Sequence, residues 1–252
     1  NLALELDTDG DDKADKEIIV AHNWENPQRF PGGASDVIGV TLDRAGNVTP
    51  GKLSTSFILA WYDGGMRQYT AYTTRNQTSP ITGVTATQAG TDSGGTYQDL
   101  DLGHAIYTFG TALPEGFDMT KTTTVGIYAT RDMINVPGGN FTKNYFANAE
   151  FDFRPDGAAL VPGEVWNLAS NAACNTCHNP LSAHGGSRQD VKLCVTCHSP
   201  QTTDPDTGNT VDFKVMIHKI HSGENLPSVQ AGTPYVIIGN NSSKHDFSDV
   251  VF

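Results

Sequence analysis

The sequence Cys174-Asn-Thr-Cys177-His178 is followed 20 residues later by Cys194-Val-Thr-Cys197-His198, and the two copies contain all four cysteines of the chain. In each copy, cysteines at positions i and i+3 can form thioethers to the two vinyl groups on one edge of a porphyrin. The histidine that follows can then bind the iron as an axial ligand. The motifs therefore predict two covalently bound c-type haems, with His178 and His198 as proximal ligands.

Two other interpretations of the cysteines stay open. The 16 residues between Cys177 and Cys194 also fit a zinc ribbon, in which four thiolates hold the metal. Four cysteines in an exported protein can instead form two disulfides. Neither alternative explains why a histidine directly follows the second cysteine of each pair, so haem attachment is the favoured prediction.

The composition limits the classes of protein to which the chain can belong. Its 252 residues make one large domain or two, and the net charge of −12 argues against nucleic acid or an anionic membrane surface as a partner. It contains no run of about 18 apolar residues, so we expect no membrane-spanning segment. The chain begins with Asn1 rather than Met, as expected of a processed or trimmed product whose haems are attached after export.

The first 160 residues contain no cysteine and are typical of β structure. Short runs of Val, Ile, Thr, Tyr and Phe alternate with breaks such as Asp63-Gly64-Gly65, Ser93-Gly94-Gly95 and Pro137-Gly138-Gly139. No helical pattern separates the runs, which favours an all-β domain, either a sandwich or a Greek-key (split) β-barrel. The expected strands are Asp36–Leu42, Leu53–Tyr62, Tyr69–Thr73, Ile81–Thr87, Ala105–Phe109, Thr123–Thr130 and Tyr145–Phe153.

The composition changes near Arg154-Pro155-Asp156-Gly157 and Val161-Pro162-Gly163, so we place a domain boundary near residue 160. Residues 161–252 contain both haem motifs and six of the eight histidines, with one clear short helix from about Asp212 to His221. Their large apolar side chains are scattered, so two porphyrins would supply much of the core. We therefore expect a loop-rich cytochrome c segment with short helices.

Each predicted haem needs a second axial ligand, and four histidines of the same segment are candidates: His184, His218, His221 and His245. Because histidines at i and i+3 lie on one helix face, His218 and His221 cannot bind opposite faces of one haem. Four candidates exceed two open positions. We therefore expect the extra histidines to serve haems of a longer protein or of a neighbouring subunit.

The second half of the chain resembles the OmcA/MtrC family, the outer-surface multihaem c-type cytochromes of metal-reducing bacteria. The resemblance depends on the order and spacing of five segments: Cys174-Asn-Thr-Cys177-His178, His184-Gly185-Gly186-Ser187-Arg188, Leu193-Cys194-Val-Thr-Cys197-His198, Asp212-Phe-Lys-Val-Met-Ile-His218-Lys-Ile-His221-Ser-Gly223 and His245-Asp246-Phe247-Ser248-Asp249. In the first half, only the stretch from Ile106 to Pro114 is similar to the family.

The resemblance implies a β domain followed by the first two haem sites of a multihaem domain, in a family that alternates β-barrel and pentahaem domains. It implies an electron carrier on the outer surface, with ferric minerals and soluble flavins as acceptors. It also makes His184, His218, His221 and His245 distal-ligand candidates, of which we favour His184 and His221. A periplasmic carrier and a multihaem reductase of a small oxyanion are the alternatives. A reductase would need an iron with an open axial position.

A second metal site is suggested near the start of the chain. The carboxylates of Asp7, Asp9, Asp11 and Asp15 follow the spacing at the beginning of a calcium-binding loop. An EF-hand would have Gly at position 6 and Glu at position 12, where this chain has Asp12 and Ile18. An acidic, solvated turn is the competing interpretation.

Overall fold

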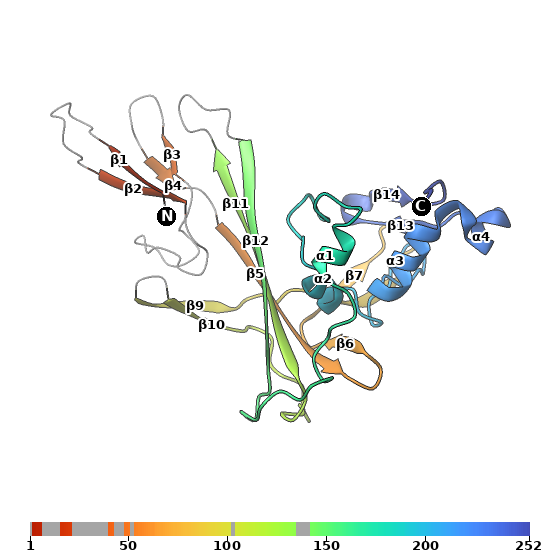
Figure 1. The fold of residues 1–252 in the computed structure, drawn as a ribbon, viewed down its shortest axis with the longest axis horizontal. Coiled ribbons are helices and arrows are strands. Elements are labelled where there is room, and N and C mark those ends of the chain that lie inside the picture. The colour runs from red at the N-terminus through yellow and green to blue at the C-terminus, as the bar shows by residue number, and fades with distance from the viewer. Residues whose placement is uncertain are drawn as a thin grey trace.

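A computed structural model describes residues 2–6, 16–21, 40–42, 48–50, 53–101, 104–134 and 142–252. In these ranges the chain is mostly β structure up to residue 153, and its short helices follow residue 170 (Figure 1). The strands are β1 (Leu2–Leu6), β2 (Lys16–Ala21), β3 (Val40–Leu42), β4 (Val48–Pro50), β5 (Leu53–Asp63), β6 (Gln68–Ala71), β7 (Thr74–Thr78), β8 (Thr85–Ala89), β9 (Thr96–Asp101), β10 (His104–Thr108), β11 (Thr123–Ile134), β12 (Thr142–Phe153), β13 (Val236–Ile238) and β14 (Lys244–Asp246).

One four-stranded antiparallel sheet forms the centre of the described structure, in the order β12-β11-β5-β6. The other described strands pair as hairpins: β1 with β2, β3 with β4, β7 with β8, β9 with β10 and β13 with β14. The mostly β character of the first half is thus confirmed. Its closure into a Greek-key barrel or a sandwich stays a prediction.

The strands expected at Leu53–Tyr62, Thr123–Thr130 and Tyr145–Phe153 lie inside β5, β11 and β12. The strand expected at Ile81–Thr87 begins only at Thr85. The hydroxyl group of Ser79 accepts hydrogen bonds from the backbone N–H groups of residues 81 and 82, which holds this segment in a turn. The expected turn at Pro137–Gly139 lies outside the described residues.

The helices are α1 (Asn171–Cys174), α2 (Val191–Cys197), α3 (Phe213–Ser222) and α4 (Pro227–Gln230), with 3₁₀ turns η1 (Gly223–Asn225) and η2 (Asn240–Ser242). The helix expected at Asp212–His221 is confirmed as α3. Caps explain where the two haem-motif helices begin, because the side chains of Ser170 and Asp190 accept hydrogen bonds from the first turns of α1 and α2. None of the described helices is long and apolar enough to cross a bilayer.

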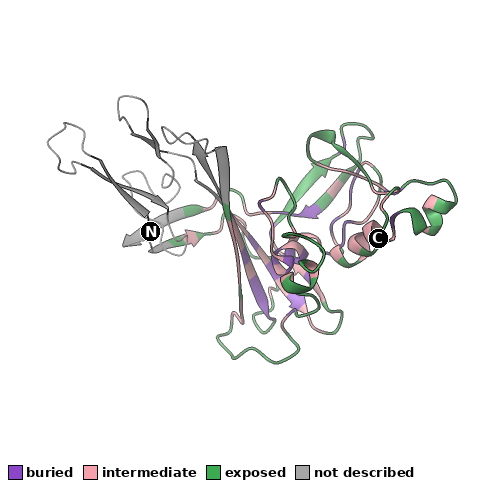
Figure 2. Cartoon of the chain, turned by 45° about the horizontal axis from the view of Figure 1, so that its top comes forward, coloured by how far each residue is buried: buried purple, intermediate pink, exposed green. Residues whose placement is uncertain are grey.

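Helix α2 packs against the central sheet and shares its hydrophobic core (Figure 2). Leu193 of α2 is 1% exposed and Ile58 of β5 is 0% exposed. Between them lies Gly126 of β11, where an added Cβ would stand 2.8 Å from both side chains. The glycine therefore lets the helix approach the sheet closely. This core joins residues on both sides of position 160, and a division into two domains there stays a prediction.

Candidate haem-binding sites

Both Cys-x-x-Cys-His motifs adopt the same helical turn. The backbone N–H of His178 donates to the carbonyl of Cys174 at 3.0 Å, and that of His198 donates to the carbonyl of Cys194 at 2.8 Å. One turn of helix separates the two cysteines of each motif. The local backbone therefore presents two thiols and the following imidazole from one short segment, as covalent haem attachment requires.

The arrangement of the four cysteines does not favour the competing zinc and disulfide interpretations. All four thiols are free, and no three His, Cys, Asp or Glu side chains within the described part of the chain converge to hold a metal ion. Burial raises the pKa of Cys194 to about 12 and that of Cys197 to about 11. Thiolates, which a zinc ribbon needs, are thus disfavoured at this pair.

The proximal histidine of the first motif faces a histidine of α3. The ring centroids of His178 and His221 are 6.2 Å apart, and the ring planes are inclined by 74°. His221 Nδ1 lies 2.8 Å from the carbonyl oxygen of Ile217, so this nitrogen carries the proton and donates it to the carbonyl. The other nitrogen, Nε2, is left as the metal-binding atom.

The proximal histidine of the second motif faces His184. Their ring centroids are 5.8 Å apart, with an interplanar angle of 28°. His198 Nδ1 lies 3.0 Å from the carbonyl oxygen of Val211, which leaves Nε2 for a metal in the same way. His184 sits in a tight loop closed by two backbone hydrogen bonds between Ala183 and Arg188, and has a φ of +52°. Such a φ is uncommon for histidine, and here two glycines with positive φ follow directly.

The ring spacing in both pairs fits an iron bound between two imidazoles. At a metal–nitrogen distance of roughly 2.0–2.1 Å, two imidazoles that bind one metal from opposite sides have centroids about 6.3 Å apart. The observed distances of 6.2 Å and 5.8 Å agree with this value. No residue of α1 or α3 is fully buried, so part of the apolar surface of these helices is available to a flat apolar group.

Both histidines of the second pair are held in the neutral form. Desolvation lowers the pKa of His198, and it is also the main cause that lowers the pKa of His184 to about 4. His184 as a whole residue is solvent-exposed, but its ring lies against His198, and nearby positive charges add to the shift. Neutral imidazoles are the form that coordinates metals.

Helix α3 connects the two histidine pairs. Its first backbone N–H, from Phe213, donates to the carbonyl of His198 at 2.7 Å. Eight residues later the same helix carries His221, which faces His178. Eight helical residues rise about 12 Å, so the two candidate sites are neighbours.

The other two histidine candidates are placed differently. His218 and His245 are both exposed, and neither ring faces a histidine among the described residues. His218 donates from Nδ1 to the carbonyl of Lys214 at 2.5 Å, which leaves its Nε2 directed away from the helix backbone. His245 Nε2 lies 3.0 Å from the hydroxyl of Ser243. The calcium candidates Asp7, Asp9, Asp11 and Asp15 lie outside the described residues.

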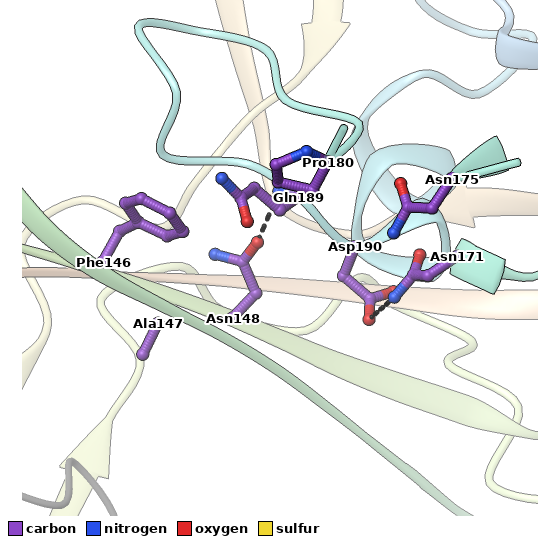
Figure 3. A pocket seen from close by; sticks show the side chains of 8 residues that line it. All are labelled: Phe146, Ala147, Asn148, Asn171, Asn175, Pro180, Gln189 and Asp190. Atoms are coloured by element: carbon purple, nitrogen blue, oxygen red, sulfur yellow. Dashed lines mark hydrogen bonds between the residues drawn. The ribbon is translucent and has the colours of Figure 1, made fainter. Parts of the chain in front are cut away.

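A shallow pocket of about 280 Å³ lies between β12 and the loops beside α1 and α2 (Figure 3). Its side chains Asn148 and Asn171 already have hydrogen-bond partners. Asn148 accepts from the backbone of Gln189 at 2.7 Å, and Asn171 donates to Asp190 at 2.7 Å. These hydrogen bonds hold the chain just before the second motif against β12 and α1. Sequence reasoning missed Asp190, although an Asp directly before Val191 is a helix-start signal.

Comparisons with known proteins match the chain to multihaem cytochromes. The family model described as "Outer membrane cytochrome MtrC/MtrF-like, domains II/IV" matches residues 167–248. The multihaem cytochrome MtrC of Shewanella baltica (strain OS185) is 31% identical over 139 residues, which are 54% of this chain and 21% of that protein. The chain thus spans about a fifth of the length of this curated relative.

The crystal structure of the outer membrane decahaem cytochrome OmcA has a similar fold, with a TM-score of 0.61 at 24% sequence identity. The likeness covers 84% of this chain and 37% of that chain, and therefore extends into the β half that the family model does not match. The family model and the MtrC relative thus show that the half of the chain with the two motifs is similar to multihaem outer membrane cytochromes, and the OmcA structure shows a similar fold over most of the chain.

Proposed function

We propose that this chain carries electrons through two c-type haems, each with two axial histidines. The residues of the first haem are Cys174, Cys177, His178 and His221, and those of the second are Cys194, Cys197, His198 and His184. The spacing of the two imidazole pairs, 6.2 Å and 5.8 Å between ring centroids, is the observation that carries the proposal.

Two histidines on each iron leave no open position for a substrate, so we propose an electron carrier rather than an enzyme. The contact of α3 with His198 at one end, and of its His221 with His178 at the other, supports electron transfer between the two haems. A multihaem reductase of a small oxyanion would need one of these histidines to leave its iron.

The remaining histidine candidates support a longer electron path. We propose that His218 and His245 serve haems of other segments or subunits, because both are exposed and neither belongs to a described pair. From its similarity to MtrC and OmcA we propose that the protein works at the outer cell surface and passes electrons to extracellular acceptors, ferric oxides and flavins.

The test is an intact mass and a ferric spectrum of the chain produced in a host that attaches haem c. Two haems add roughly 1.2 kDa, and two bis-histidine irons give a purely low-spin spectrum. The variant C194A/C197A should carry one haem. An unmodified mass, or zinc in place of iron, would end the proposal, and a high-spin band would favour the reductase.

A further inference from the structure

Two arginines beside the second haem site, Arg75 and Arg188, have no acidic partner among the described residues. Among the described side chains, the ion pairs are Arg154–Asp156, Lys192–Asp152 and Lys244–Asp246. Neither Arg75 nor Arg188 forms an ion pair with any described residue. Arg75 makes one hydrogen bond, from Nη2 to Oε1 of Gln88 at 3.4 Å, so most donors of its guanidinium group are left for another acceptor.

Arg188 belongs to the same tight loop as His184. Its backbone pairs with Ala183 across the loop, and this pairing holds Arg188 close to the distal histidine candidate His184. Its guanidinium lies 3.7 Å above the ring of Tyr128 and makes one hydrogen bond, to the hydroxyl of Ser187 at 2.5 Å. An arginine has five N–H donors, so most of them are left for another acceptor.

Arg75 reaches the second site from the β half. It stands on β7 directly opposite Gln88 of β8, and its side chain lies flat over Gly90, where an added Cβ would meet its Cγ at 3.0 Å. Gln88 donates to the carbonyl of Thr203 at 2.7 Å. This contact joins the hairpin to the chain just after the second haem motif and so brings Arg75 to that site.

Hydrogen bonds hold both arginines close to the second motif. The backbone N–H of Ala89, next to Gln88, donates to the hydroxyl of Thr202, and this hydroxyl donates to the carbonyl of Cys197. Arg188 stands four residues after His184 in the same loop. Two positive charges from different parts of the chain thus meet at one haem site.

We propose that Arg75 and Arg188 bind the propionate groups of the haem attached at Cys194 and Cys197. This inference rests on the haem assignment above. Thioethers fix one edge of the porphyrin, and the opposite edge carries two carboxylates. Planar guanidinium groups bind carboxylates through two parallel hydrogen bonds. The β half therefore takes part in binding the second haem and in setting its reduction potential.

Removing a guanidinium should make the second haem harder to reduce. Ferric haem carries one more positive charge than ferrous haem, so a nearby cation favours the ferrous form. At the effective dielectric constant of a protein site, loss of one such charge changes the equilibrium constant between ferric and ferrous haem about tenfold. For a one-electron couple a tenfold change equals 59 mV.

The measurement is an anaerobic potentiometric titration of the haem-loaded chain, followed by electron paramagnetic resonance. Near-parallel axial imidazoles give a rhombic low-spin ferric signal, and near-perpendicular ones give a large-gmax signal. The interplanar angles of 28° and 74° therefore allow the second and first haems to be followed separately. Substitutions R75Q and R188Q are compared with R67Q, which removes the same charge from an exposed turn.

We expect R75Q and R188Q each to lower the midpoint potential of the haem that gives the rhombic signal by about 59 mV, which corresponds to a tenfold change. R67Q should leave this potential unchanged. Equal midpoints in all three variants would overturn the assignment of the arginines. If a glutamine variant loads poorly, R75K and R188K decide, because they keep the charge. A wild-type midpoint in the lysine variants supports the proposal, and loss of the second haem in them overturns it. Absence of both low-spin signals from the parent chain would instead refute the haem assignment itself.

Discussion

Glu150 gives the chain a stability that depends on pH. This carboxyl lies on β12 beneath α2, and its Oε1 atom is buried without a hydrogen-bond partner among the described groups. Burial raises its pKa from 4.5 to about 7, and the negative charge of Asp190 adds to the shift. Lys192 opposes the shift, while Asp152 increases it. The folded protein therefore holds a proton on Glu150 more tightly than the unfolded chain does.

The sign and size of the effect follow from this shift. Because the folded pKa is the higher one, the stabilisation by the proton is fully present below pH 4.5 and is lost as the pH rises toward 7. A difference of about 2.5 pKa units corresponds to at most about 3.4 kcal/mol. Glu150 is only partly buried, and solvent screening reduces the expected loss to about 1–2 kcal/mol.

The variant E150Q tests this reasoning, because glutamine is neutral at every pH. Urea unfolding of the haem-loaded protein should give equal free energies for parent and E150Q at pH 4.5, and at pH 8 the variant should be more stable by about 1–2 kcal/mol. E164Q, at an exposed position, is the matched control and should follow the parent. Parallel stability curves for parent and E150Q between pH 5 and 8 would refute the argument.

Three further predictions follow from the geometry of the helices. In G126A the new Cβ meets Ile58 and Leu193, so the free energy of unfolding should fall by about 1–3 kcal/mol in urea titrations; an unchanged value would mean that α2 does not pack as described. D190A removes the cap of α2 and its bond to Asn171, which should cost about 0.5–2 kcal/mol, and a neutral result would contradict the capping role. H221A should abolish the large-gmax signal and create a high-spin haem, whereas H245A should leave both low-spin signals intact.

The long strands and helix α3 could be predicted from the sequence, because both depend on local patterns. Cysteines at i and i+3 with a following histidine have few other uses, and the helix that carries His221 has clear apolar periodicity. The helical structure of α2 and its packing on the sheet could not be predicted from such a local pattern. Its buried Val191, Leu193 and Val195 alternate with a period of two, which is typical of a strand, yet they lie in a seven-residue helix.

The distal histidines were predicted only as a set, because which ring faces which depends on tertiary contacts. His184 owes its position to a loop with three successive residues at positive φ, and His221 owes its position to the anchoring of α3 at His198. Strand β7, which brings Arg75 to the second site, also escaped prediction, whereas β8 was predicted in part. All five residues of β7 are exposed and polar, so no hydrophobic pattern marks them as a strand.

The packing of α2 on the sheet has a consequence for the order in which the protein matures. Thioether formation needs reactive thiolates and access for a porphyrin, whereas the folded chain raises the pKa of both Cys194 and Cys197 by burial. We therefore expect the attachment machinery to act on this motif while the chain is still open. The modified helix α2 would then pack on the sheet, so we expect folding to be completed only after the cofactor is attached.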